Sequence, residues 1–376
     1  MPIVKTVYSK AALDLQKIME TNPGLIIAFY GPDSDANGIF STLNDSKIPF
    51  IACSDTGRFL GDSYHLEEDS FVALGFPKEI FDSIDIIHYD LSPEKNYGEI
   101  KKDVKEKYLS SLKNSGIDRN SPDMEREFVI NLLYGLASAN PVLEAQSEIS
   151  LFLQTVGGSS GGKLDFIHSE VMTNGMKGKI GASAIIRLKK DYKMVIDRIS
   201  SFEQVKGSLK VTALENPRHI RELNGKPALD EYLSSVGETK DNLSASLFAR
   251  YTLGIEPGDG EKLITSIMKD DGKGGLLTYN DLVEGTELNI YSAKSQEADR
   301  KSQLQSLKSL EPIIYISFDC VLCYLARNAM DEKEKIAKLY SENLPNTGVM
   351  GFGTFSENIC GANVNQTETF LAIYKA

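Results

Sequence analysis

One construction occurs three times in this chain, and it constrains the fold more than any other feature of the sequence. Each copy begins with a short apolar run, continues with a segment of helical pattern, and closes with a second apolar run that ends in small and hydroxyl residues. Short apolar runs bounded by Gly and Pro are typical of strands buried on both faces. The three opening runs are 24–31, 128–135 and 313–319, and the three closing turns are 53–57, 157–162 and 351–357. Repeats of a strand–helix–strand unit predict an α/β fold with helices packed on mixed β-sheets.

Charge and composition exclude several classes of function. The net charge is −12, from 41 basic and 53 acidic residues among 376. An acidic chain is a poor partner for nucleic acid or for anionic membranes. No apolar run reaches the roughly 18 residues of a membrane span, and the N-terminus has no signal-peptide core. Four cysteines in so long a chain do not form a disulfide framework. We therefore expect a cytoplasmic protein that binds neither nucleic acid nor membranes.

Between the repeats, the pattern predicts further elements. We expect helices at 8–20, 34–45, 141–152 and 296–310, the last of them charged and solvated, and a surface helix with a long loop over 93–127. Strands are expected at 70–76, 84–88, 164–172, 181–188, 194–199 and 287–292, an extended stretch at 247–253, and hairpin turns at 173–175, 189–193 and 270–275. A strand pattern stops near 211–224, and Pro227 suits the first turn of a helix. The predicted division is an N-terminal helix (1–22), a first domain (23–220) and a second domain (221–376).

Six short motifs resemble a known family. They are Ile-Ala-Cys-Ser-Asp-Thr-Gly at 51–57, Val-Gly-Gly-Ser-Ser-Gly at 156–161, Glu-Leu-Asn-Gly-Lys-Pro-Ala at 222–228, Phe-Asp-Cys at 318–320, Gly-Phe-Gly-Thr-Phe-Ser-Glu at 351–357 and Asn-Gln-Thr at 365–367. In this order they resemble the FIST sensory domain, with its N-terminal and C-terminal parts, over 23–374. The resemblance implies a small-molecule-sensing input module of bacterial signal transduction, with amino acids suggested as ligands. Some members are nitric-oxide-sensing haem proteins that act beside histidine kinases.

The chain departs from the haem-sensing branch of that family at four positions. Where that branch tends to have Arg, this chain has Cys323 and Thr265; where it tends to have His, this chain has Asn363. At the end of the second repeat's strand, where the family commonly has Asp, this chain has Tyr134. Replacing Arg removes a bidentate clamp for an anion, so haem or a carboxylate is not expected to be held in the usual way.

The glycine- and hydroxyl-rich turns are the best candidates for a ligand pocket. Glycine lets backbone N–H groups approach a ligand, and ligands of α/β sheets gather at the carboxyl ends of strands. The alternative is that these glycines only serve tight turns between packed strands. The candidate ligand-binding residues are Cys53, Ser54, Gly57, Gly157, Gly158, Ser159, Ser160, Cys320, Phe352, Thr354, Glu357, Asn365, Gln366 and Thr367. We expect no catalytic group and no metal site among them.

Two phosphate- and nucleophile-type motifs occur in the second turn. Residues 157–163 nearly match a phosphate-binding P-loop, but Leu164 stands where Ser or Thr must hold magnesium, and a strand is expected next instead of a helix. Residues 158–162 match the G-x-S-x-G nucleophile elbow, with Ser160 as nucleophile and His168 or His219 available as partners. This motif also needs a helix directly after the turn, and the sequence predicts a strand there instead.

The remaining reactive side chains leave further alternatives. Cys320 and Cys323 form a C-x-x-C at a strand end, which suits either redox chemistry or two buried, inert thiols. The four histidines, His65, His88, His168 and His219, are scattered, although one His can ligate haem iron.

Our leading hypothesis is a non-enzymatic ligand-binding sensor that signals to a separate partner, such as a histidine kinase. The alternatives are a haem-dependent nitric-oxide sensor, a serine hydrolase using Ser160, and a thiol-redox enzyme using the C-x-x-C pair.

Overall fold

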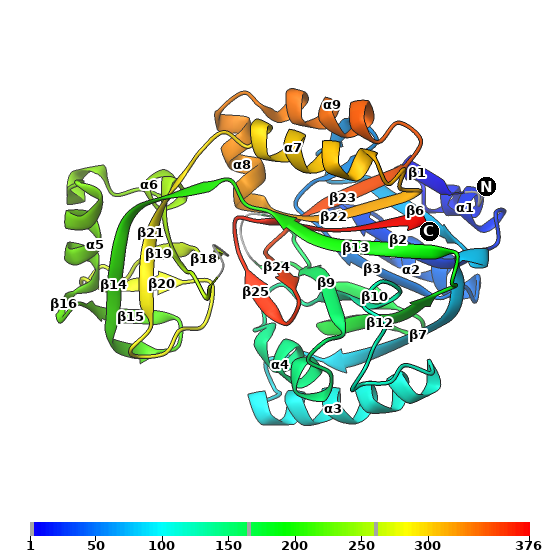
Figure 1. Ribbon diagram of the computed structural model, residues 1–376, viewed down its shortest axis with the longest axis horizontal. Coiled ribbons are helices and arrows are strands. Elements are labelled where there is room, and N and C mark those ends of the chain that lie inside the picture. Colours follow the sequence, from blue (N-terminus) through cyan, green and yellow to red (C-terminus); the bar gives the residue numbers. More distant parts are fainter. Residues whose placement is uncertain (1–3, 164–166, 259–261) are drawn as a thin grey trace.

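The computed structural model describes residues 4–163, 167–258 and 262–376. It confirms the predicted α/β architecture: three six-stranded sheets with helices on their outer faces, and an eight-stranded antiparallel sheet to one side (Figure 1). No helix in these ranges is both long and apolar enough to cross a membrane.

The three repeats form the centres of the three large sheets. In each unit a helical segment connects two parallel neighbouring strands: β2 to β3 in sheet I, β8 to β9 in sheet II and β22 to β23 in sheet III. Sheet I contains, in spatial order, β1 (Lys5–Ser9), β6 (Phe71–Pro77), β2 (Pro23–Tyr30), β3 (Phe50–Ser54), β10 (Val171–Thr173) and β11 (Met176–Gly178). Sheet II contains β7 (Phe81–Asp90), β12 (Ile180–Leu188), β8 (Glu127–Leu133), β9 (Gln154–Ser159), β24 (Ser356–Ile359) and β25 (Ala362–Val364). Sheet III contains β13 (Tyr192–Ile199), β26 (Glu368–Lys375), β22 (Ile314–Cys320), β23 (Gly348–Thr354), β4 (Arg58–Leu60) and β5 (Ser63–His65).

The three sheets exchange hairpins in a cycle. The hairpin β4–β5 follows the closing turn of the first unit but pairs with β23 of the third. In the same way, β10–β11 follows the second unit and joins sheet I, and β24–β25 follows the third unit and joins sheet II. The three units are therefore interlocked, and their closing turns meet at one place.

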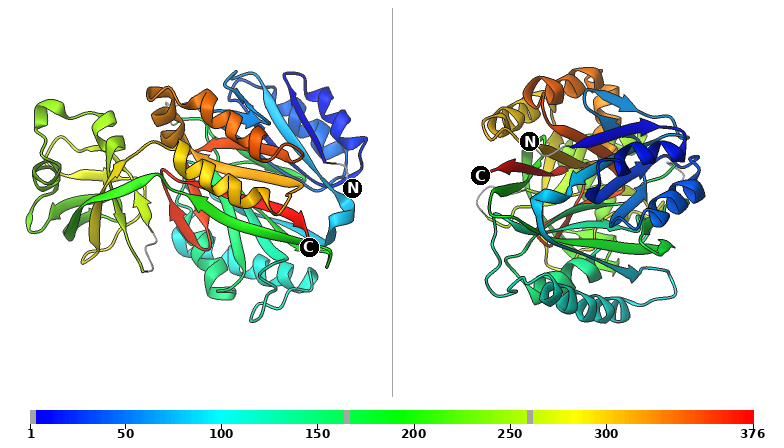
Figure 2. Two further views of the ribbon diagram at one scale, coloured as in Figure 1. Left: turned by 45° about the horizontal axis from the view of Figure 1, so that its top comes forward. Right: turned by 90° about the vertical axis from the view of Figure 1, so that its right-hand side faces the viewer.

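Helices cover the outer face of each large sheet, and the inner faces share one core. The helical segments are η1 (Ala12–Leu15), α1 (Gln16–Met19), α2 (Ala36–Asp45), η2 (Lys78–Ile80), α3 (Tyr97–Asn114), α4 (Asn140–Ile149), α7 (Glu297–Lys308), α8 (Val321–Ala329) and α9 (Lys333–Asn343). Helices α1 and α2 lie on sheet I, α3 and α4 on sheet II, and α7 and α9 on sheet III (Figure 2). Inside, the Phe29 ring of sheet I stacks on Phe352 of sheet III at 3.9 Å and meets Phe318 edge-on at 6.4 Å.

The eight-stranded sheet belongs to a segment that precedes the third unit, between β13 and α7. It contains β14 (Phe202–Asn216), β15 (His219–Leu223), β16 (Lys226–Pro227), β17 (Tyr251–Ile255), β18 (Leu263–Thr265), β19 (Ile267–Asp270), β20 (Leu276–Thr278) and β21 (Glu287–Ala293), with α5 (Ala228–Val236), η3 (Lys240–Asn242) and α6 (Ala245–Arg250) beside it. We call residues 202–293 the small body and the three large sheets with their helices the core body. The domain boundary at residue 220 stays a prediction; it falls inside β15.

Local sequence explains where several helices begin. Asn96 and Glu99 form a reciprocal capping box at the start of α3, in which each side chain accepts a hydrogen bond from the other's backbone N–H. The side chain of Asp35 caps α2 by accepting from Gly38 N–H at 2.9 Å.

Some elements differ from the prediction. The helix expected at 8–20 is a strand to Ser9 followed by short helical segments, because residues 5–9 pair with β6. The hairpin expected at 189–193 is wrong, because β12 pairs with β7 and β8 while β13 pairs with β26, so the chain crosses between sheets there. Of the strand expected at 164–172, only its end from Val171 is strand, and 164–166 lie outside the described residues. Residues 245–250, expected to be partly extended, form α6.

Candidate functional site

The three closing turns meet and bond to one another through their backbones. Gly161 N–H donates to the Ser54 carbonyl oxygen at 2.9 Å, which joins the second turn to the first. Gly353 N–H donates to the Gly57 carbonyl at 2.6 Å, which joins the third turn to the first. Phe355 N–H donates to the Ser159 carbonyl at 3.2 Å, which completes the cycle. The carboxyl ends of all three parallel strand pairs thus lie together, as expected for an α/β ligand site.

The predicted hydroxyl residues of the first two turns mainly hold these turns in place. Ser54 Oγ donates to the Gly161 carbonyl at 2.7 Å and accepts from Glu170 N–H at 2.9 Å. Ser159 Oγ bonds to Ser356 Oγ at 2.8 Å. These partners satisfy buried polar groups, as folding requires, and they leave the two hydroxyls committed to protein.

The two glycines in β9 are needed for close packing between strands. A Cβ on Gly157 would stand 2.0 Å from the Asn131 carbonyl oxygen of β8, and a Cβ on Gly158 would stand 2.5 Å from Thr354 Cγ2. Both lie within a strand. The strand-packing interpretation therefore accounts for these two residues.

Ser160 is fully buried, and its hydroxyl is bonded to residues outside the turn. Its Oγ lies 2.5 Å from Ser169 Oγ and accepts from Gly135 N–H at 3.0 Å. A nucleophile elbow instead exposes its hydroxyl at the top of a sheet.

Cys53 lies in the apolar core rather than at a pocket. It is 0% exposed, and burial raises the pKa of its thiol well above the ordinary range. Of the predicted residues in the first turn, Gly57 is the one that lines a cavity.

Cys320 and Glu357 form a buried acid–thiol pair at the end of β22. Burial raises the pKa of both side chains well above the ordinary range, which favours the neutral acid and the neutral thiol. The Cys320 sulfur also receives backbone N–H groups of Leu322, Cys323 and Gln366. Thr354 Oγ1 donates to Glu357 Oε1, while Glu357 Oε2 is buried without a hydrogen-bond partner.

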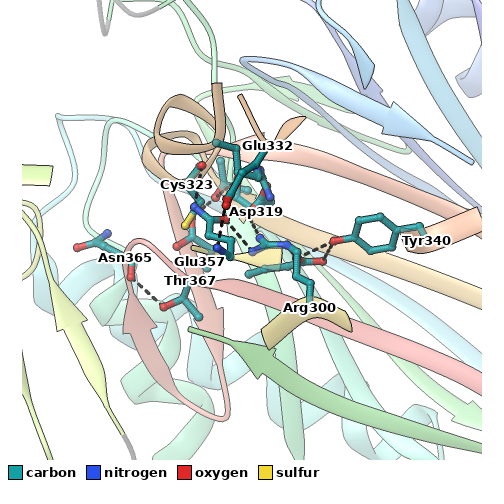
Figure 3. A network of polar contacts seen from close by, with 12 residues as sticks. Arg300, Asp319, Cys323, Glu332, Tyr340, Glu357, Asn365 and Thr367 are labelled. Atoms are coloured by element: carbon teal, nitrogen blue, oxygen red, sulfur yellow. Dashed lines mark hydrogen bonds and ion pairs between the residues drawn. The ribbon is translucent and has the colours of Figure 1, made fainter. Parts of the chain in front are cut away.

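A buried ion network lies beside this pair, and sequence reasoning missed it (Figure 3). Arg300 of α7 reaches Asp319 Oδ1 at 3.1 Å and Glu368 Oε2 at 2.8 Å. Glu368 also accepts from Tyr315 and Tyr340 hydroxyls, each at 2.7 Å. Burial alone would lower the pKa of Arg300, but the Glu368 carboxylate raises it above its usual range. Arg300 therefore remains charged inside the protein.

The helix that carries Arg300 was expected to be solvated, and this is wrong for one of its faces. Arg300, Leu304 and Leu307 are its buried residues. Their spacing of four and three residues places them on one helical face, and this is the signal that identifies Arg300 as inward-facing.

Arg327 is the second buried arginine of the network, and it is only partly paired. It is 0% exposed, and its Nη2 bonds to Asp319 Oδ2. Its Nε and Nη1 have no hydrogen-bond partner, and burial lowers the pKa of the guanidinium. Asp319 therefore accepts from Arg300 on one carboxylate oxygen and from Arg327 on the other.

Arg327 lines a small cavity between the first and third turns, which we call the turn cavity. Its volume is about 10 Å³, room for one water molecule. Thr56, Gly57 and Tyr64 line it from the first unit, and Asp319, Tyr324, Arg327 and Phe352 from the third. The guanidinium lies over the Tyr64 ring, 5.7 Å from its centroid. Gly57 and Phe352 are the two predicted residues in this lining.

A second buried ion pair supports the floor of the turn cavity. Arg58 Nε lies 2.8 Å from Asp55 Oδ2, and its Nη2 lies 2.6 Å from Asp55 Oδ1, so the contact is bidentate. Its Nη1 donates to Ser70 Oγ at 2.6 Å. Because these donors all have protein partners, Arg58 is a structural group. Arg327 is the arginine of the lining that still has donors free to bind a ligand.

The last predicted residues lie at the junction with the small body. Asn365 N–H donates to the Ile264 carbonyl of β18 at 3.3 Å, and Thr367 Oγ1 donates to the Asn365 carbonyl at 2.9 Å. Gln366 is 3% exposed, and its Nε2 has no hydrogen-bond partner.

A larger groove lies at the other end of sheet III. It encloses about 680 Å³ beside the amino ends of β22 and β23, where Ile313 and Gly348 lie. None of the predicted site residues lines it. Ligands of α/β sheets bind at the carboxyl ends of the strands, so we assign the turn cavity as the candidate site.

The turn cavity does not fit haem. Its lining contains no histidine or cysteine among the described residues, and its volume is far below that of a cofactor pocket. His65 stacks on Tyr8 with ring centroids 3.9 Å apart, and His219 bonds to Asp271 at 2.9 Å in the small body.

The three strand–turn units of this α/β protein thus enclose a buried polar site. A model of the FIST N domain matches residues 24–226, and a model of the FIST C domain matches 228–359. The chain belongs to the FIST family, whose domains are sensory. No curated protein matches it.

Two solved structures resemble the chain only weakly. One is phosphoribosylformylglycinamidine synthase II from Thermotoga maritima, with 9% identity over 99% of this chain and 72% of that one, at a TM-score of 0.19. The other is T. maritima PurL complexed with ATP, with 10% identity over 99% and 71%, also at 0.19. A TM-score this low does not establish a shared fold.

Proposed function

We propose that this chain is a non-enzymatic sensory domain that binds a small anionic ligand in the turn cavity and passes the signal to a separate protein. The observation that carries the proposal is Arg327. A guanidinium has five N–H donors, and this one is fully buried with Nε and Nη1 unpartnered. Buried donors need acceptors, and a carboxylate is the acceptor that suits a guanidinium best.

The size of the turn cavity supports a role in signalling. About 10 Å³ holds one water molecule, so a carboxylate ligand enters only if a wall moves. Tyr324 and Arg327 both lie on α8, which makes α8 the wall on the third unit. A ligand that binds only the shifted arrangement increases the population of that arrangement, which is how a sensor reports occupancy.

Amino acids are the first ligands to test, since they carry a carboxylate and the family is thought to sense them. A cytoplasmic site of action is part of the proposal; four cysteines that form no disulfide are consistent with a reducing compartment. A histidine kinase is the proposed kind of partner.

The experiment is a thermal-shift panel of the twenty amino acids with wild-type protein, Arg327→Lys and Arg119→Met. Arg327→Lys keeps the charge next to Asp319 but loses the planar fork, so we expect at least tenfold weaker binding. Arg119 is exposed and serves as the control. A ligand at 100 times its Kd stabilises by about 2.7 kcal/mol.

Two further readouts separate the alternatives. A stoichiometric haem Soret band that shifts under nitric oxide would favour the haem sensor over our proposal. Ester turnover abolished by Ser160→Ala would favour a hydrolase. No response to any amino acid, or an equal response in Arg327→Lys, would contradict binding in the turn cavity.

A further inference from the structure

The small body is attached to the core body by only two chain crossings, and these lie side by side. The chain leaves β13 and enters β14 through residues 199–202, and it returns from β21 to α7 through residues 293–297 (Figure 1). Lys294 N–H donates to the Ser201 carbonyl at 3.1 Å, so the two crossings are bonded to each other. Two adjacent crossings make a hinge.

Several polar contacts join the two bodies away from the hinge. Asn280 Nδ2 donates to the Asn363 carbonyl at 3.2 Å, and Asn363 Nδ2 donates to Asn280 Oδ1 at 2.8 Å. In the described part of the chain, no hydrophobic core cluster includes residues of both bodies. An interface without a shared apolar core permits relative motion of its two sides.

A second small cavity lies at this hinge, and we call it the hinge cavity. It measures about 10 Å³ and is lined by both crossings, by Ala249 of the small body, and by residues of the core body. From the crossings come Ser201, Phe202 and Lys294; from the core body come Cys323 and Gln366. Neither body contains this cavity alone, so its shape depends on their relative position.

Two buried polar groups in the lining lack partners. Gln366 Nε2 and Ser201 Oγ have no hydrogen-bond partner, although the side chains are only 3% and 6% exposed. Gln366 also has a φ of +47°, a left-handed conformation that favours glycine, and its N–H is bonded to the Cys320 sulfur. The backbone of Gln366 is therefore held in place beside the hinge.

The lining chemistry selects an acceptor-bearing ligand. An amide N–H and a hydroxyl donate, and Lys294, whose ammonium lies 3.2 Å from Asp299, adds positive charge at a partly exposed edge. Arg300 also lines the hinge cavity, but its guanidinium is already paired with Asp319 and Glu368. Two unpartnered donors beside a lysine match a small carboxylate.

We propose that the hinge cavity is a second binding site, for a small carboxylate, and that its occupation turns the small body relative to the core body. A carboxylate is larger than the water-sized space present, so it is admitted only when the two crossings separate. The bound anion then stabilises the opened hinge, because it satisfies Gln366 and Ser201 in that arrangement. This inference concerns a cavity apart from Arg327 and does not depend on a ligand in the turn cavity.

The test uses sodium acetate as the probe, with sodium chloride at equal ionic strength as the reference. Spin labels at the exposed Cys360 of the core body and at Ser234→Cys, on the exposed side of α5, report the distance between the bodies. Acetate is expected to raise the melting temperature and to shift that distance. Acetamide, which has the same shape without the charge, is expected to act at least tenfold more weakly.

Variants of the lining residues test whether acetate binds in the hinge cavity. Ser201→Ala with Gln366→Leu is expected to weaken acetate binding about tenfold or more and to abolish the distance change. Lys294→Met, at the exposed edge, is expected to weaken binding without affecting folding. Ser317→Ala is the matched control, because Ser317 is also buried with an unpartnered hydroxyl but lies in β22 away from the hinge.

Three outcomes would overturn the proposal: no acetate response in the wild type, an unchanged response in both hinge variants, or equal potency of acetamide. Arg327→Lys distinguishes the two cavities. An acetate response that survives Arg327→Lys supports the hinge site. One lost in Arg327→Lys and kept in the hinge variants places acetate in the turn cavity instead, which overturns the hinge proposal but not the proposed function.

Discussion

Arg300 and Arg327 approach opposite oxygens of the same buried carboxylate, Asp319. Arg300 Nη2 lies 3.1 Å from Oδ1, and Arg327 Nη2 bonds to Oδ2. Arg327 lines the turn cavity and Arg300 lines the hinge cavity, so Asp319 connects the two proposed sites. A movement of α8 that admits a ligand beside Arg327 also changes the position of a group that binds Asp319. Energetic coupling between two sites requires such a shared element.

Removing Arg300 is expected to destabilise the protein strongly. Arg300→Met leaves Glu368 and half of Asp319 buried without a compensating cation, at a cost of about 3–5 kcal/mol. Urea unfolding followed by circular dichroism measures this change. Lys301→Met, an exposed neighbour on α7, should stay within about 0.5 kcal/mol of the wild type. Similar values for the two variants would mean that the buried network contributes nothing to stability.

A side chain at Gly157 is expected to separate β8 from β9. The new Cβ of Gly157→Ala would stand 2.0 Å from the Asn131 carbonyl oxygen, which is backbone and cannot rotate away. We expect a loss of about 1–3 kcal/mol in the free energy of unfolding, the range for overpacking a well-packed interior. Gly207→Ala is the control, since no atom lies within 4 Å of its added Cβ. The idea fails if both variants unfold at the same urea concentration.

Glu357 is expected to make stability fall as pH rises. Its pKa in the folded protein lies well above its ordinary value of 4.5, because burial favours the neutral acid. Above pH 4.5 the unfolded chain releases this proton and the folded chain keeps it, so the contribution is complete below that pH and declines as pH approaches the folded pKa. The decline is about 1.4 kcal/mol per pH unit.

The Glu357→Gln variant isolates this effect, since its amide does not titrate. Unfolding free energies at pH 5, 6 and 7 should show the wild type losing stability relative to Glu357→Gln. Glu203→Gln, at an exposed site, is the control and should track the wild type. A difference between wild type and Glu357→Gln that stays constant with pH would show that Glu357 is ionised in the folded protein.

The repeated strand–helix–strand pattern was sufficient to predict the α/β fold and the main strands and helices of the three units. These depend on local order along the chain: apolar runs, a helical segment, and glycine at the end. The exchange of hairpins was not predictable in this way. The hairpin after the turn at 53–57 pairs with β23, nearly 300 residues further on, and no local signal in 58–65 names that partner. The crossing at 189–193 was misread as a hairpin for the same reason.

Predicted site residues were mostly those that build the site, and the charged groups within it were missed. Asp319 stands inside the quoted Phe-Asp-Cys motif, but its partners Arg300 and Arg327 come from helices on either side of β22 in sequence. A charged residue in a lysine- and glutamine-rich helix is usually solvated, so the composition of α7 does not predict that Arg300 is buried. The family position occupied by Cys323 lacks its arginine, and Arg327 lies four residues later, one turn along the same helix.

The four thiols are expected to differ sharply in reactivity, which tests the redox alternative. Cys360 is exposed, whereas Cys53, Cys320 and Cys323 are at most 6% exposed and burial raises the pKa of each. Disulfide reagents react with thiolate, which the three buried groups do not form near neutral pH. Ellman's reagent should therefore titrate one thiol per chain quickly in native protein and four in denaturant.

The Cys360→Ser variant should remove the fast phase of that titration and leave the denatured count at three. A redox pair predicts the opposite behaviour: Cys320 and Cys323 would react in the native protein at a rate comparable to that of Cys360. In that case a Cys320→Ser variant would abolish the second fast phase, and the C-x-x-C motif would have to be assigned to thiol chemistry. Retention of a single fast thiol, lost only with Cys360, assigns these two cysteines to the packing of β22 against α8.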